Sequence, residues 1–344
     1  MLRNIDKVSG IDKISTRSRM NDATFITLSM LGVLIVLLGL ACLFVPNFYL
    51  GQNIINLVTN YWFVIVLGIG VTFLLITGNF DMSVSGIVAM SGVLSVYFCQ
   101  AAHVSQSELA NGLGLPYWAA IVLALTASLI IGAINAFFIT KLKVASIIVT
   151  LGTMSIARGI AHIVTHGAQR NTSLPDVFKV IGNITVIGSI KLSVIIMIIF
   201  VIIAVIIEKR TVFGRRTYLI GANIEAARLS GVKVGQHLTI LYLISSLLAG
   251  ITGILLASEY VSGTSNRAMG SEFDALVIVL LGGTSIAGGF GSVSGTVIGA
   301  LILAVVTSSA TGLLLRPEWQ FILKGIVTFL AIMAQRFALD RRNI

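Results

Sequence analysis

Long runs of apolar residues, separated by short polar segments, follow one another along almost the whole chain. A helix needs about 20 apolar residues to cross about 30 Å of hydrocarbon. Ten segments reach or approach this length, and we expect each to be a membrane helix. They are residues 25–45, 54–77, 82–102, 118–140, 144–163, 185–207, 238–257, 275–289, 293–315 and 319–335. Eight spans is the alternative, if two of the weaker segments are re-entrant.

Composition supports a membrane protein over a soluble one. Of the 344 residues, 56% are hydrophobic and 10% are charged, and the mean hydropathy is +1.01. Soluble domains carry roughly 25% charged residues, so a soluble fold could not cover this much apolar surface. The pattern therefore predicts an all-α fold, a polytopic bundle of transmembrane helices with Gly-rich breaks.

The distribution of Lys and Arg predicts the orientation. With the N-terminus inside, most of the 23 basic residues fall in inner segments, as the positive-inside rule expects. Both termini are then cytoplasmic. The predicted parts are a tail at 1–24, a permease domain at 25–336 with an inner loop at 208–237, and a tail at 337–344. Topology also explains the net charge of +10, so no nucleic-acid partner is expected.

Several chemical signatures are absent from the sequence. There is no P-loop for nucleotide phosphates, no H-E-x-x-H zinc motif and no arrangement typical of a catalytic triad. We therefore expect no enzyme activity, no cofactor and no metal on this chain. Cys42 and Cys99 both lie in apolar stretches and are interpreted as inert thiols.

Asp81 is notable because it lies in the very short segment that connects two predicted spans. One interpretation is a tight turn in which Asp81 caps the following helix. The other is an unwound segment at membrane depth, which is tolerated where it is buried in protein or lines a cavity. Both hypotheses fit the sequence, and a capping Asp also stabilises a broken helix.

The loop 208–237 is the largest and most basic inner segment. Within it, residues 223–231 predict a short helix with Asn223 as N-cap, Glu225 in the first turn and Gly231 as the stop. Ile224, Ala227 and Leu229 would give this helix a small apolar face. We expect a cytoplasmic partner to receive that face in a groove.

Glycines dominate residues 282–299. Gly291, Gly295 and Gly299 recur every four residues, which places a bare stripe on one helix face where another helix packs closely. The two Gly pairs at 282–283 and 288–289, with Thr284 and Ser285, instead predict a break in the helix. Such breaks form substrate sites or gates in transporters.

Two charged residues fall inside predicted spans, Arg158 and Lys324. An ionisable residue within a span is a functional candidate, although both lie near enough to an end to reach the interface. No carboxylate lies at the middle of a span to relay a proton. This absence argues against an ion-coupled transporter.

Five stretches in this order resemble one family, the permease subunits of bacterial ABC importers for ribose, xylose, arabinose and galactosides. They are TGNFDMSV (77–84), LGTMSIARG (151–159), FGR (213–215), GANIEAARLSG (221–231) and LGGTSIAGGFGSV (281–293). The resemblance covers about residues 50–335. It departs from the family pattern at Asn79, Phe80, Ser85 and Phe290.

The resemblance implies the partners and the site. Such permeases sit in the bacterial inner membrane, pair with a second copy or a paralogue, bind a cytoplasmic ATPase that holds ATP and Mg, and receive solute from an extracytoplasmic binding protein. By this resemblance, the ATPase-coupling residues are Asn223, Glu225, Ala226, Ala227, Arg228 and Gly231. The residues expected nearest the translocation pathway are Thr77, Asn79, Phe80, Asp81, Ser83, Thr153, Arg158, Thr284 and Ser285.

The implied function is import of a small polar solute, with a monosaccharide first. Relatives that carry nucleosides, autoinducer-2 or polyols provide the alternative substrates. From other functional classes, an ion-coupled secondary transporter and a membrane scaffold without transport are the remote alternatives.

Overall fold

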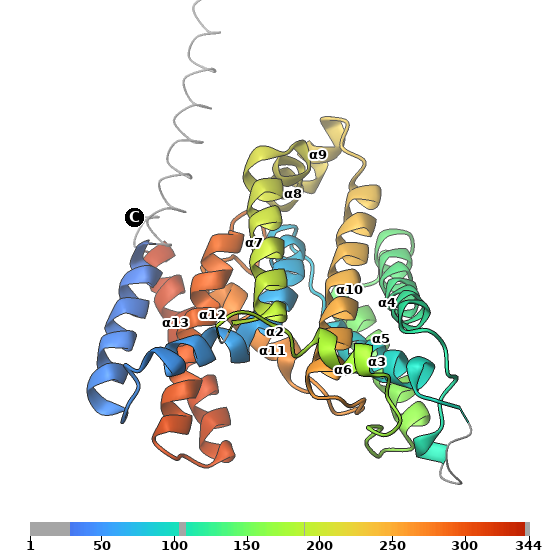
Figure 1. Cartoon of the computed structure of the whole chain (residues 1–344). Coiled ribbons are helices and arrows are strands. Elements are labelled where there is room, and N and C mark those ends of the chain that lie inside the picture. Colours follow the sequence, from blue (N-terminus) through green and yellow to red (C-terminus); the bar gives the residue numbers. More distant parts are fainter. Residues whose placement is uncertain (1–27, 103–107, 189, 341–344) are drawn as a thin grey trace, which may run out of the picture.

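The computed structural model describes residues 28–102, 108–188 and 190–340, and most of them are helical (Figure 1). Six of the described helices are long and apolar enough to cross a membrane. They are α2 (Gly51–Ile76), α4 (Tyr117–Thr140), α5 (Ser146–Thr165), α7 (Leu192–Arg210), α10 (Val234–Glu259) and α12 (Val293–Gly312). Each of the ten predicted segments overlaps a described helix, but only these six meet the length and hydropathy of a full span.

The remaining elements complete the described chain. The helices among them are Leu28–Phe44, α3 (Val84–Cys99), η2 (Glu108–Ala110), α6 (Asp176–Ile181), α8 (Val212–Ala222), α9 (Ile224–Leu229) and α11 (Ser271–Leu281). The last helix is α13 (Pro317–Asp340), and β1 (Thr185–Ile187) pairs with β2 (Ile190–Lys191) in an antiparallel hairpin. The predicted all-α class therefore holds apart from this small hairpin.

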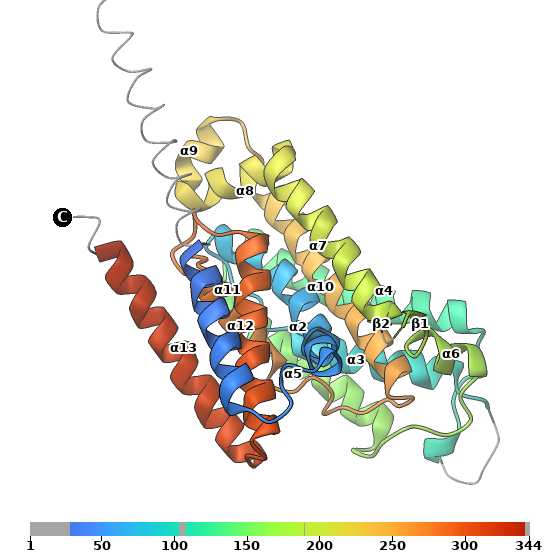
Figure 2. The same cartoon turned by 60° about the vertical axis from the view of Figure 1, so that its left-hand side comes forward.

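The core of the bundle is built on α2 and α10. In their most apolar stretches, 83% of the residues of α2 and 72% of those of α10 are buried, against 22% for α5. Figure 2 shows α2 in the middle of the molecule, where it packs against α7, α10, α11 and α12. The outer helices α4, α5 and α7 leave much of their apolar surface uncovered, as helices that face lipid or another subunit do.

Two predicted spans have the wrong boundaries. The segment 185–207 was expected to be helical throughout, but its start forms the β1–β2 hairpin, and α7 then runs from Leu192 to Arg210. The segment 275–289 was expected to be one short span. Instead α11 begins at Ser271 and ends at Leu281, because Gly282 and Gly283 follow, and Gly283 has a φ of 87° that a helix does not contain.

Two of the three glycines in the predicted stripe, Gly295 and Gly299, pack as expected. A methyl group added at Gly299 would overlap the carbonyl oxygen of Ile278, and one added at Gly295 would overlap the carbonyl oxygen of Gly282. The two glycines thus let α12 approach the backbone of α11 directly. Gly291 precedes α12 and lies against the side chain of Thr284 instead.

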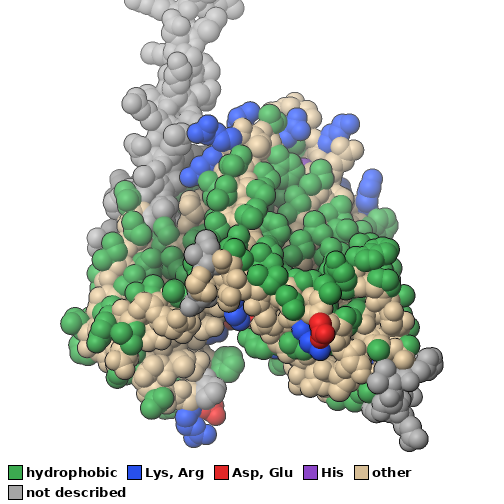
Figure 3. All heavy atoms as spheres, viewed as in Figure 1, with side chains coloured by type: hydrophobic (Ala, Val, Ile, Leu, Met, Phe, Trp, Pro, Cys, Tyr) green, Lys and Arg blue, Asp and Glu red, His purple; other side chains and the backbone are tan. Residues whose placement is uncertain are grey.

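Basic residues gather at one end of the molecule. Figure 3 shows Lys and Arg side chains around α8 and α9, and hydrophobic side chains over the middle of the surface. The basic residues of this loop are Lys209, Arg210, Arg215, Arg216, Arg228 and Lys233. The last described helix, α13, also ends on this side (Figure 2). It extends to Asp340, so the predicted tail at 337–344 begins as helix, and the predicted N-terminal tail at 1–24 lies outside the described residues.

Candidate functional site

The chain between α2 and α3 is not helical over residues 77–83, although both helices are deeply buried. Gly78 takes a φ of 76°, which turns the chain out of α2. The Phe80 N–H donates to Ser146 Oγ at 3.0 Å, and the Tyr242 hydroxyl donates to the Phe80 carbonyl oxygen at 3.1 Å. Side chains of two other helices therefore satisfy the unwound backbone, as a non-helical segment within a membrane requires.

Asp81 lies at the centre of this break and is 3% exposed. Its Oδ1 accepts hydrogen bonds from the Ser83 N–H at 2.9 Å and from the Ser83 hydroxyl at 2.5 Å. Its Oδ2 accepts one from the Ser245 hydroxyl of α10 at 2.7 Å. Because Ser83 is the N-cap residue of α3, Asp81 holds the start of that helix. The structure thus combines parts of the two interpretations: Asp81 is not itself the N-cap but holds the N-cap residue Ser83, and it lies in an unwound, buried segment of the bundle.

The hydrogen bonds of Asp81 continue across two further helices. Asn135 Nδ2 of α4 donates to Ser83 Oγ at 2.9 Å, and Thr153 Oγ1 of α5 donates to Asn135 Oδ1 at 2.6 Å. Ser83, Asn135 and Thr153 are all buried. The result is a continuous polar chain from α10 through the break to α4 and α5. A buried network of this kind fixes one arrangement of its helices when every member is satisfied.

Thr77 and Asn79 form the polar edge of the break. The Thr77 hydroxyl donates to the Leu74 carbonyl oxygen at 2.7 Å, and Asn79 Nδ2 donates to Thr77 Oγ1 at 3.1 Å. Both bonds stay within the same stretch of chain. Asn79 is part-buried, and its neighbour Gly78 is exposed.

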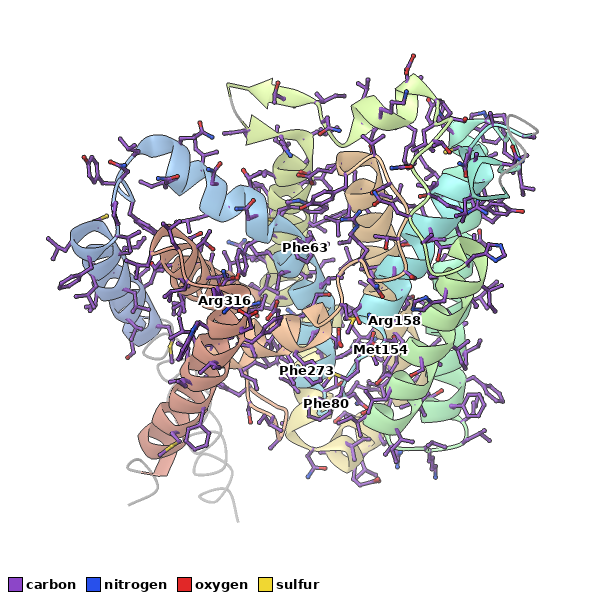
Figure 4. The ribbon with its side chains drawn as sticks, turned by 90° about the horizontal axis from the view of Figure 1, so that it is seen from below. Phe63, Phe80, Met154, Arg158, Phe273 and Arg316 are labelled. Carbon is purple, nitrogen blue, oxygen red and sulfur yellow. The ribbon has the colours of Figure 1, made fainter. Side chains whose placement is uncertain are left out.

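Arg158 of α5 lies beside the start of α3. Its NH2 group donates to Ser85 Oγ at 3.1 Å, and its Nε has no hydrogen-bond partner among the described residues. Of the ion pairs within the described chain, none includes Arg158. Viewed from the end opposite α8 and α9, Phe80, Met154 and Arg158 all lie near the middle of the bundle (Figure 4). The guanidinium Nε is thus a buried donor that no described residue satisfies.

A second break separates α11 from α12, over residues 282–292. The Ser285 N–H donates to the Phe290 carbonyl oxygen at 3.0 Å, which closes a tight loop. Thr284 is completely buried, and its hydroxyl has no partner among the described residues. Thr284 and Ser285 therefore lie in a break, as predicted, and not within a span.

The short helix α9 forms as the sequence predicts. Asn223 Oδ1 accepts from the N–H groups of Glu225 and Ala226 at 3.0 Å each, so Asn223 is the N-cap. Gly231 follows the helix with a φ of 80°. Glu225 and Arg228 form an exposed ion pair of 2.6 Å, with 68% and 50% of their side chains accessible.

The apolar residues of α9 do not share one exposed face. Ala227 is completely buried against the bundle, whereas Ile224 is 42% exposed and Leu229 is 89% exposed. Ala227 therefore anchors α9 to this chain. The surface that α9 presents outward consists of Ile224, Glu225, Arg228 and Leu229.

The predicted residues thus fall into two groups. At the first break lie the pathway candidates Thr77, Asn79, Phe80, Asp81, Ser83 and Thr153. Arg158 lies next to this break, and Thr284 and Ser285 lie in the second break. The coupling candidates lie together on and around α9. Sequence reasoning did not single out Asn135, Ser146, Tyr242 and Ser245, which hold the first break. The signal for Asn135 was present, since it is a lone amide in an apolar span.

The other charge predicted within a span has a partner. Lys324 Nζ of α13 lies 2.8 and 3.0 Å from the two carboxylate oxygens of Asp274 in α11. Less than a quarter of either side chain is accessible. Lys324 therefore joins α11 to α13. Among the residues that the structure describes, no group of three or more His, Cys, Asp or Glu side chains could hold a metal ion.

The family model of permease components of branched-chain amino acid transport systems matches residues 53–332, which includes both breaks and α9. This chain belongs to that permease family. Three curated relatives are a ribose import permease of Haemophilus influenzae, an L-arabinose transport permease of Escherichia coli and a galactose/methyl galactoside import permease of Escherichia coli. Their identities to the chain are 31%, 33% and 30%. No solved structure matches the chain.

These relatives are similar over nearly their full length. The alignments cover 88%, 90% and 95% of this chain, and 91%, 90% and 100% of the relatives. Permease subunits of ABC transporters are not enzymes themselves, since a separate subunit hydrolyses ATP. Because its relatives are membrane permeases and it has six long apolar helices, this permease is an integral membrane protein.

Proposed function

We propose that this permease is the translocating subunit of an ABC importer for a monosaccharide. The observation that carries the proposal is the similarity to ribose, arabinose and galactose permeases over the whole bundle, both breaks and α9 included. The pathway runs beside the break at residues 77–83. There the part-buried Asn79 amide and the Arg158 guanidinium are hydrogen-bonding groups of a kind that suits sugar hydroxyls.

The same proposal assigns the partners and the orientation. The basic end with α8 and α9 is cytoplasmic, in accord with the positive-inside rule. The ATPase docks on the exposed residues of α9, and the binding protein delivers solute at the opposite end. A second permease, either a copy or a paralogue, completes the pathway. The ten segments are all membrane-embedded, with α3 and α11 as shorter elements.

Co-purification tests the ATPase assignment. The tagged permease, extracted gently in detergent, is expected to retain a subunit that hydrolyses ATP. Glu225→Lys should abolish this retention and solute uptake while leaving membrane insertion intact, because it reverses the charge on the outer face of α9. If the wild-type chain retains no ATPase and none restores uptake when added back, the proposed function is wrong.

Asp176→Lys is the matched control for this variant. Asp176 also forms an exposed ion pair with a basic residue three positions on, Lys179 at 2.9 Å, but it lies on α6 at the opposite end of the molecule. The same charge change there should leave ATPase retention unaltered. Uptake of labelled ribose, arabinose, galactose, a nucleoside and a polyol then separates the candidate solutes. Uptake that survives loss of ATP but fails when the ion gradient collapses would support the secondary transporter.

A further inference from the structure

The last turn of α8 lies against the end of α2 with no side chain between them. A methyl group added at Gly221 would overlap the carbonyl oxygen of Ile76, the last residue of α2, and would lie 2.5 Å from the backbone nitrogen of Gly289. Figures 1 and 2 both place α8 next to this end of α2. Only glycine fits at position 221, because the approaching atoms belong to rigid backbone.

The Ile76 carbonyl joins the two breaks directly. The carbonyl groups in the last turn of a helix have no partner within it. The Phe80 N–H, four residues after Ile76, bonds to Ser146 instead, and the Gly289 N–H of the second break donates to the Ile76 oxygen at 2.7 Å. A methyl group at Gly288 would lie 2.9 Å from the Gly78 nitrogen. The backbones of the two breaks therefore touch at the point where α8 meets them.

A second attachment runs from α7 and α8 to the start of α12. The Tyr218 hydroxyl lies 2.7 Å from the Gly291 carbonyl oxygen and 2.9 Å from Glu208 Oε1. Glu208 is 5% exposed, and its Oε2 accepts from the Val293 N–H at 2.9 Å. A carboxylate at a helix N-terminus is favourable, so Glu208 and Tyr218 hold the end of the second break to α8.

Only Asn223 separates α8 from α9, the helix assigned above to the ATPase. Backbone in van der Waals contact does not compress, so a displacement of α9 that moves α8 must also move Ile76 and Gly289. We propose that Gly221 and Tyr218 are positioning residues that make α8 and the two breaks one mechanical unit. Motion of the ATPase would then reach both breaks at once. This inference rests on the proposed function.

The first test compares Gly221→Ala with Gly235→Ala in the full permease with its co-purified ATPase. Gly235 lies at the start of α10 on the same side, and its nearest neighbour to an added methyl group is Thr140 Cβ at 3.9 Å. Gly221→Ala should retain the ATPase and its basal hydrolysis but lose at least tenfold in solute transported per ATP hydrolysed. Gly235→Ala should keep that ratio. A proportional fall of hydrolysis and uptake in Gly221→Ala would show a purely structural role and overturn the proposal.

Tyr218→Phe provides a milder variant in case Gly221→Ala does not fold. It removes one hydroxyl and should lower the same ratio about threefold. Tyr260→Phe, an exposed tyrosine at the opposite end, is its control. An unchanged ratio in Tyr218→Phe would exclude this hydroxyl from the linkage.

Hydrogen–deuterium exchange on the permease alone separates failure of this linkage from failure of the proposed function. Gly221→Ala and Tyr218→Phe should both speed exchange in residues 77–83 and 283–292, relative to their controls. If neither break changes, α8 does not hold them, and the inference is wrong even where the importer assignment stands. If exchange changes but the wild-type chain retains no ATPase, the mechanical unit stands and the proposed function fails.

Discussion

Ser245→Ala tests whether the Asp81 carboxylate is held in place by the hydroxyl groups around it. The substitution removes the donor that bonds Oδ2 among the described residues and leaves that oxygen buried without this partner. A hydrogen bond to a charged group contributes about 1.5–3 kcal/mol, so we expect the free energy of unfolding to fall by about 2 kcal/mol. Asp81→Asn should cost less, about 1 kcal/mol. Its amide oxygen still accepts from Ser83, and its NH₂ group donates to Ser245.

Ser246→Ala is the matched control, because within the described structure the neighbouring hydroxyl donates to the Leu243 carbonyl oxygen of its own helix at 3.1 Å. Its cost should stay within about 0.5 kcal/mol, since such bonds add little to a helix. The assay is SDS-induced unfolding of the detergent-solubilised permease, followed by the fluorescence of buried residues such as Trp62. If Ser245→Ala costs no more than Ser246→Ala, or less than Asp81→Asn, the account of this network is wrong.

Two further predictions concern packing. Lys324→Met should lower the free energy of unfolding by about 2 kcal/mol, because it leaves the Asp274 carboxylate unpaired in a partly buried site. Adding Asp274→Leu should restore most of this loss. A double variant as unstable as the single one would contradict an ion-pair effect. Gly299→Ala should cost about 1–3 kcal/mol because its methyl group would overlap the Ile278 carbonyl oxygen. Gly325→Ala, with nothing within 4 Å of the added carbon, is its control in the same unfolding assay, and equal stability of the two variants would refute the close contact.

The sequence predicted the helices well where one rule decides them. A long apolar run in a membrane protein must be helical, because no other single segment satisfies its own backbone in lipid. Each of the ten predicted segments therefore overlaps a described helix. The errors at 185–207 and 275–289 arose where the apolar residues extend beyond the helix. Hydropathy does not distinguish a helix from an apolar hairpin. A glycine pair indicates where a helix ends, but not where that helix begins.

The candidate site was predicted in part for a similar reason. Asn223 and Gly231 were assigned correct local roles, since capping and left-handed backbone depend on neighbours in sequence. Asp81 was expected to cap α3, but the N-cap is Ser83, which Asp81 holds in place. Two residues that complete the first break, Asn135 and Ser245, lie 52 and 164 positions from the break residues they bond, Ser83 and Asp81. A local sequence pattern does not identify which distant residue such a side chain bonds. The resemblance pointed to stretches of sequence but not to the contacts between them.

The sequence by itself determined that this permease is a helical membrane protein, and it located the break at Asp81, the glycine-rich break and the short helix α9. These features depend on composition, on the span of a bilayer and on hydrogen bonds between near neighbours. Only the tertiary structure decided that Asp81 is enclosed by donors from Ser83 and α10, and that Gly221 brings α8 against both breaks. The reason is physical: these contacts join segments far apart in the chain, and their distances exist only once the helices have packed.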